Sequence, residues 1–225
     1  MILPAGAWGP LLLSFQVAAL GTLIASVFGV ALAALLASRR FLGRDLVDAL
    51  VSAPMVLPPT VLGYYLLGLL GRRSAVGHAF ESVTGSSIVF TQGAAVLAGA
   101  LAALPFVVKA SRAAIEDVDP SYAAAASTLG ASPSRVFFAI TLPLASRGVL
   151  AGVAVGFARA LGDFGVTLMI AGNLEGVTRT APLAIYDAVL ADEQARAGGM
   201  AAVLTAVAIG ALYGVNKLAQ RTRRG

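Results

Sequence analysis

Long apolar runs separated by short polar segments make up most of the 225-residue chain. A helix needs about 20 residues to cross the ~30 Å hydrocarbon core of a bilayer. Four runs of at least that length carry no charge, and a fifth carries only Arg159 and Asp163. The five runs are residues 11–37, 49–71, 82–108, 148–171 and 197–216. We therefore predict an all-α, polytopic membrane protein with about five transmembrane helices.

The composition supports a membrane protein and excludes several kinds of site. Charged residues make up 12% of the chain and the mean hydropathy is +0.87, whereas about 25% charge is usual in soluble domains. The first run lacks a basic leader and is longer than a signal-peptide core, so we interpret it as a span. With no cysteine and only His78 as histidine, we expect no metal site and no cofactor.

The basic residues predict the orientation of the chain. A net charge of +5 could suggest a nucleic-acid partner, but Lys and Arg in a membrane protein also collect on the cytoplasmic side. An outside N-terminus and a cytoplasmic C-terminus leave only Arg72, Arg73, Arg179 and Arg196 outside. The eleven basic residues placed inside are Arg39, Arg40, Arg44, Lys109, Arg112, Arg135, Arg147, Lys217, Arg221, Arg223 and Arg224. We therefore expect no nucleic-acid partner.

The longest predicted cytoplasmic segment, residues 109–147, contains clear helix-capping signals. Asp119 followed by Pro120 is typical of an N-cap and a first helical position. Gly130 can end that helix in a left-handed conformation, and Ser132 with Pro133 can begin a second one. The pattern predicts two short helices that meet at a bend.

The second of these helices has an apolar face. Val136, Phe137 and Ile140 lie at helical spacing, while Arg135 stays polar. We expect this face to be mostly open, and Pro143 to stop the helix just before the fourth span. Periodicity alone equally allows a pair of amphipathic helices that lie on the lipid headgroups.

The spacing within ASTLGASPSRVFFAITLP favours another interpretation. Gly130, nine residues, and then Ile140 to Pro143 match the pattern G-x(9)-I-x-L-P, and the chain closely resembles ABC importer permeases, which carry this pattern in their EAA loop. The resemblance implies that residues 119–143 form coupling helices that insert into a cytoplasmic ATPase subunit. The acid that names the motif is replaced by Ala124. The ATPase-coupling residues implied are Asp119, Gly130, Ala131, Ser132, Pro133, Arg135, Val136, Phe137, Ile140 and Pro143.

Two further stretches indicate which permeases the chain resembles. SAPMVLPPTVLGYYLLGLLGRR and FARALGDFGVTLMIAGNLEGVTRTAPLAIY are similar to molybdate permeases of bacterial ABC importers, and the resemblance spans about residues 11–217. Sulfate permeases share part of the second stretch but are typically longer and work as two different subunits. The resemblance therefore implies an oxyanion importer, for molybdate or for tungstate, with a sulfate-type permease as the alternative.

The resemblance also implies a domain plan and partners. We expect a type I transmembrane domain at 11–217, with the coupling loop at 109–147, and a basic cytoplasmic tail at 218–225. The protein would lie in the cell (inner) membrane as a homodimer, with cytoplasmic ATPase subunits and an external oxyanion-binding protein. No G-x-x-x-x-G-K-[ST] motif occurs, so we expect a non-catalytic subunit driven by a separate ATPase. An ion-gradient secondary transporter is the alternative of another class.

Small and charged residues in the fourth span suggest two features. Gly148, Gly152, Gly156 and Ala160 form a stripe that lets another helix approach, either within the chain or across a homodimer. Arg159 and Asp163 must face protein or water. We predict that these two charges lie near the translocation path, as a structural ion pair or as part of a gate.

The remaining candidates lie in the second span and outside the membrane. Pro54, Pro58 and Pro59 remove backbone donors and predict a break, which either faces the path or is a packing kink. Arg72 and Arg73 could anchor the span or concentrate an oxyanion at the outer mouth. The segment from Asn173 to Arg179 could dock the binding protein or be a plain solvated loop.

Overall fold

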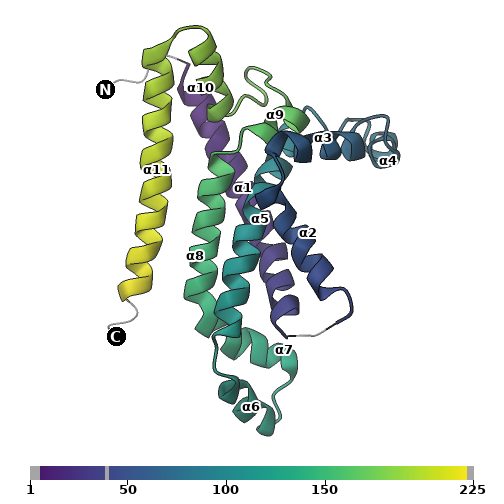
Figure 1. The fold of residues 1–225 in the computed structure, drawn as a ribbon, viewed down its shortest axis with the longest axis vertical. Coiled ribbons are helices and arrows are strands. Elements are labelled where there is room, and N and C mark those ends of the chain that lie inside the picture. Colours follow the sequence, from purple (N-terminus) through teal and green to yellow (C-terminus); the bar gives the residue numbers. More distant parts are fainter. Residues whose placement is uncertain (1–5, 39–40, 222–225) are drawn as a thin grey trace.

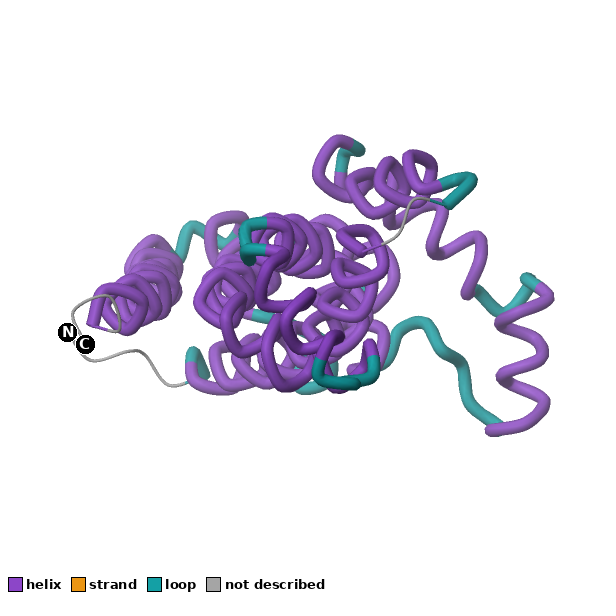
Figure 2. Tube along the Cα trace, turned by 90° about the horizontal axis from the view of Figure 1, so that it is seen from below, coloured by secondary structure: helices purple, strands orange, loops and turns teal. Residues whose placement is uncertain are grey.

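The computed structural model describes residues 6–38 and 41–221, and these residues form helices joined by short loops (Figure 1). The end-on view shows no strand among them (Figure 2). Arg39, Arg40 and residues 222–225 of the expected basic tail lie outside the described residues. The helices are α1 (Trp8–Ser38), α2 (Arg44–Val56), α3 (Pro59–Leu70), α4 (Ala75–Thr84), α5 (Gln92–Glu116), α6 (Pro120–Thr128), α7 (Pro133–Val136), the π-helix η1 (Phe137–Thr141), α8 (Leu142–Leu161), α9 (Gly165–Ala171), α10 (Ala181–Leu190) and α11 (Gln194–Arg221).

The expected five spans are present within residues 6–38 and 41–221 when the bent pair α2 and α3 is taken as one span. The third span begins at Gln92 rather than 82. Gly85 ends α4 in a left-handed conformation, and the Thr91 hydroxyl then caps α5 by accepting the N–H of Ala94 at 3.1 Å. The fourth span ends at Leu161 rather than 171, and α9 is a separate short helix.

The core is built from α1, α5 and α8, which pack through small residues. A Cβ added to Gly152 would lie 2.6 Å from Cβ of Ala110, and one added to Gly156 would lie 3.1 Å from a methyl group of Val107. The small stripe of the fourth span therefore faces α5 of the same chain. Intramolecular packing is confirmed for these glycines, because no other helix could occupy the same surface.

The second span is broken where the prolines predicted, between α2 and α3, which meet at a bend of 118°. Pro58 is the N-cap of α3 and Pro59 its first residue, whereas Pro54 lies inside α2 and causes no break. Beyond the bend, α3 packs tightly on α9. A Cβ on Gly63 would lie 2.5 Å from Cβ of Met169, so the backbone of α3 at Gly63 packs directly against the Met169 side chain of α9.

The coupling loop contains the two predicted short helices, α6 and α7, which meet at Gly130 with φ +79°. The prediction that Pro143 stops the second helix is wrong. Pro143 lies in the first turn of α8, and the N–H of Leu142 donates to the carbonyl of Phe137 through the π-helix η1. In this wider turn the hydrogen bonds span five residues instead of four, just before Pro143, which has no N–H to donate. Pro133–Leu161 is therefore one continuous helical segment.

The two ends of the bundle differ. α6 and α7 extend from one end, at which α5 ends and α8 begins; α3, α4, α9 and α10 lie at the other (Figure 1). α1 begins at the end occupied by α10, where the Ser14 hydroxyl accepts the N–H of Ala181 at 2.6 Å. α11 runs back along the bundle toward the end that carries α6.

Candidate functional site

The exposed side chains of the coupling loop differ from those that its periodicity suggested. Val136 is buried, and Phe137 packs against a buried cluster that includes Leu36 and Ala145. The expectation of a mostly open face of Val136, Phe137 and Ile140 is therefore wrong in its inner part, because tertiary packing covers it. Between Asp119 and Pro143, the large apolar side chains that are exposed are Tyr122 (55%), Leu129 (88%) and Phe138 (68%).

Local hydrogen bonds fix the shape of the loop. Asp119 Oδ1 accepts the N–H of Ser121 at 2.8 Å, which holds the pKa of that carboxyl below its usual range. The Ser132 hydroxyl accepts the N–H of Arg135 at 3.4 Å. Both predicted N-caps are confirmed. Ala131, Pro133 and Arg135 follow the bend, and Ala124 leaves a methyl group on the exposed surface of α6.

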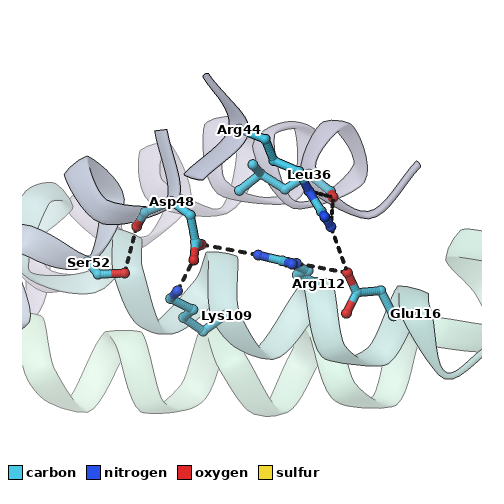
Figure 3. Close-up of polar contacts among 7 residues, drawn as sticks. All are labelled: Leu36, Arg44, Asp48, Ser52, Lys109, Arg112 and Glu116. Carbon is cyan, nitrogen blue, oxygen red and sulfur yellow. Dashed lines mark hydrogen bonds and ion pairs between the residues drawn. The ribbon is translucent and has the colours of Figure 1, made fainter. Parts of the chain in front are cut away.

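A group of charged residues links α2 to the last part of α5, shortly before α6 begins (Figure 3). Asp48 Oδ1 lies 2.8 Å from Lys109 Nζ and 3.2 Å from Arg112 Nη1. Glu116 Oε1 lies 2.8 Å from Arg112 Nε and 3.4 Å from Arg44 Nη2. We call these five residues the charge cluster. Sequence reasoning missed the contact of Asp48 with α5, although an acid directly before an uncharged span is a signal that could have drawn attention to it.

Arg159 and Asp163 form the structural ion pair that was one of the two alternatives. Arg159 Nη1 lies 3.5 Å from Asp163 Oδ1. Asp163 Oδ2 accepts both the N–H and the hydroxyl of Thr167, at 2.9 and 2.8 Å. The Asp163 side chain is 1% exposed, so its carboxylate is buried at the junction of α8 and α9. The Arg159 side chain is 34% exposed and reaches the surface.

Arg72 and Arg73 line a cavity of about 1290 Å³ between the end of α3 and the start of α5. Arg72 Nε lies 3.5 Å from Glu81 Oε1 and its side chain is 67% exposed. Arg73 is exposed as well. Polar and aromatic side chains share the lining, namely Tyr64, Tyr65, Ser74, Ser86, Ser87, Phe90 and Thr91. The cavity can therefore present cationic and hydroxyl groups to an anion.

The predicted docking segment is an ordered loop. Arg179 Nε donates to Asn173 Oδ1 at 3.0 Å and lies 3.2 Å from Asp187 Oδ2. The Asn173 amide also donates to both carboxylate oxygens of Asp187 at 2.9 Å. Asn173 and Arg179 therefore hold the loop against α10, and Leu174, Glu175 and Val177 are the side chains that project. The role of Asp187 was not foreseen from the sequence.

Comparison with known proteins places the chain in a family. Residues 5–223 match the family described as binding-protein-dependent transport system inner membrane component. The chain belongs to this family. As a member of it, the chain is a multi-pass component of an inner-membrane transport system.

Named relatives within the family are similar over most of their length. The molybdenum transport system permease protein ModB of Escherichia coli K12 is 44% identical over 186 residues, which are 83% of this chain and 81% of that protein. ModB of Haemophilus influenzae is 45% identical over 174 residues, 77% of this chain and 76% of that protein.

Solved structures share the fold. The chain matches an inward-facing MetNI methionine ABC transporter with a TM-score of 0.71 at 15% identity, covering 96% of this chain and 94% of that one. A bacterial alginate ABC transporter in complex with a periplasmic protein bound to an alginate pentasaccharide gives a TM-score of 0.76 at 15% identity, covering 97% and 80%. At these identities the likeness shows the transmembrane fold alone. The expected type I importer fold is confirmed.

Proposed function

We propose that this chain is the permease subunit of an ATP-driven importer that carries molybdate across the cell membrane. The observation that carries the proposal is the 44% identity to a molybdenum transport permease over 83% of the chain. Tungstate has the same charge and nearly the same size and is the second expected cargo. The permease provides the path and binds no nucleotide, so a separate ATPase subunit hydrolyses ATP.

The coupling loop supports the assignment of the ATPase-facing end. α6 and α7 project beyond the bundle (Figure 1). Tyr122 of α6, Leu129 at its C-cap and Phe138 of η1 are exposed. Apolar side chains on a rigid, capped projection suit insertion into a groove on another protein. This end of the molecule is cytoplasmic in our proposal, so the N-terminus lies outside and α11 ends inside.

The opposite end receives the substrate in this proposal. Arg72 and Arg73 line the outer cavity and raise the local concentration of a divalent oxyanion. The projecting loop from Asn173 to Arg179 contacts the external binding protein. Arg159 and Asp163 border the path beside the broken second span, at which Pro58 and Pro59 are exposed. Because one chain supplies few spans, the path is enclosed by a homodimer.

ATP hydrolysis by the reconstituted complex tests the proposal. The purified chain is placed in liposomes with its ATPase and binding proteins, and hydrolysis is compared with molybdate, tungstate and sulfate. We expect stimulation by molybdate and tungstate, and loss of stimulation when Leu129 and Phe138 are both replaced by Ser. Replacing exposed Leu150 on α8 by Ala is the matched control. Stimulation by sulfate alone would contradict the proposed cargo.

A further inference from the structure

α2 has few buried apolar contacts with the rest of the molecule. Val51 is the one buried residue of α2. On the same helix Leu46 and Leu50 are 64% and 63% exposed. By contrast, α5 is buried along most of its length. Apolar packing therefore fixes α5 firmly and α2 only weakly.

The charge cluster forms the polar contact between α2 and α5. Asp48 is the only acid of α2 in contact with a base among the described residues, and it lies between Lys109 and Arg112 of α5 (Figure 3). Arg44 extends the cluster to α1, because its guanidinium donates to the Leu36 carbonyl at 2.9 and 2.6 Å. The five side chains are 22–42% exposed, so solvent screens each pair and the contacts can separate at small cost.

The two helices that the charge cluster joins connect to different segments: α5 leads into α6, and α2 leads into α3. Glu116 is the last residue of α5, and α6 begins at Pro120 after the cap Asp119. A displacement of the coupling loop therefore reaches the cluster within one helical turn. On the other side, α2 meets α3 at the 118° bend, and α3 is fixed to α9 through the close approach of Gly63 to Met169. Movement of α2 would pivot at Leu57 and Pro58.

From this arrangement we propose that Asp48 is a positioning residue for transport, which couples movement of the ATPase-facing loop to the broken span through its contacts with Lys109 and Arg112. The inference rests on the proposed function. α5 carries the displacement, the cluster transmits it to α2, and the bend between α2 and α3 converts it into a change in the path. A fixed structural bond is a poorer account, because half-exposed pairs add little stability.

The test is the amount of molybdate imported per ATP hydrolysed in proteoliposomes that contain the chain, its ATPase and its binding protein. Asp48→Asn should lower this ratio about fivefold or more while ATP hydrolysis continues. Asp48→Glu should retain it, because the carboxylate remains. The matched control is Asp45→Asn on the same helix, since Asp45 is exposed and has no ion pair among the described residues. Its ratio should equal that of the wild type.

A second variant and a distance measurement provide two further tests. Lys109→Gln, which leaves α2 unchanged, should lower the ratio in the same direction even if Asp48→Asn does not assemble. An unchanged ratio in both variants, or hydrolysis and import that fall together, would overturn the inference. If the wild type imports no molybdate, the proposed function fails first. In that case the distance between spin labels at Leu46 of α2 and Ala113 of α5 is measured with and without ATP and the ATPase. A distance that does not change would contradict the coupling role of Asp48.

Discussion

Single residues set the spacing of the central helices. The glycines at 148, 152 and 156 allow α8 to approach α5 without intervening side chains, and Gly21 does the same for α1, where an added Cβ would lie 2.7 Å from the backbone N of Ala100. The stripe in the fourth span was visible in the sequence from its spacing of four. Its partner was not, because the residues that face it lie about 40 positions away.

Gly152→Ala should destabilise the protein. The new methyl group would lie 2.6 Å from Cβ of Ala110 and 3.3 Å from the carbonyl O of Phe106, so we expect a loss of about 1–3 kcal/mol from overpacking. The melting temperature of the purified protein measures it. Gly210→Ala on α11 is the matched control, since an added Cβ there meets nothing within 4 Å. Equal melting temperatures for the two variants would contradict the packing account.

Asp163 has two separable roles, as a hydrogen-bond acceptor and as a charge. Asp163→Ala leaves the buried N–H and hydroxyl of Thr167 without their acceptor and should cost about 1–3 kcal/mol. Asp163→Asn keeps an amide oxygen for Thr167 and removes only the charge that faces Arg159. We therefore expect the Asn variant to melt between the Ala variant and the wild type. An Ala variant as stable as the wild type would contradict the described junction of α8 and α9.

At the scale of elements, helix ends and breaks could be predicted from neighbouring residues, whereas contacts between segments far apart in the sequence could not. The caps of α6 and α7 and the break at Pro58 depend on residues within a few positions of one another, so their sequence pattern was sufficient. Phe137 packs on a cluster that draws residues from α1, α5 and α8, and the contact of Asp48 with α5 spans about 60 residues. The π-helix before Pro143 has no sequence signature of its own, so the predicted stop was wrong.

Asp119→Ala should loosen the first turn of α6. The carboxylate accepts the Ser121 N–H, and its lowered pKa means that the cap is intact above the usual carboxyl pKa and is lost as the pH falls through the lower folded value. Hydrogen exchange of the α6 amides in the assembled protein measures the effect, and it should be faster in the Ala variant. Asp119→Asn keeps an acceptor and is the control. Identical exchange in all three proteins would show that the cap has no role.

The bend between α2 and α3 can be tested for contact with water. Because the chain has no cysteine, Thr60→Cys introduces a single thiol at an exposed position just beyond the bend. If the break faces the path, a small, charged thiol reagent should label it in intact membranes. Leu23→Cys, at an exposed position on the span α1, should stay unlabelled. Labelling that is equal at the two positions, or absent at Thr60, contradicts a break that faces the path.

At the scale of the whole molecule, the two ends carry different chemistry. One end presents the capped coupling loop with its exposed apolar side chains and the charge cluster above it. The other end presents the arginine-lined cavity and the loop held by Asn173, Arg179 and Asp187. The sequence predicted both sets of segments, because composition and hydropathy define the spans. It could not predict how α2 is attached, since that depends on side chains brought together only by folding.

We propose above that this chain forms an ATP-driven path for molybdate. The most direct measurement is uptake of labelled molybdate into proteoliposomes that contain the chain, its ATPase and its binding protein, with ATP inside or outside. We predict uptake only when ATP is on the side of the coupling loop and all three proteins are present. Uptake that proceeds without ATP and follows an imposed ion gradient would contradict the account and identify a secondary transporter instead.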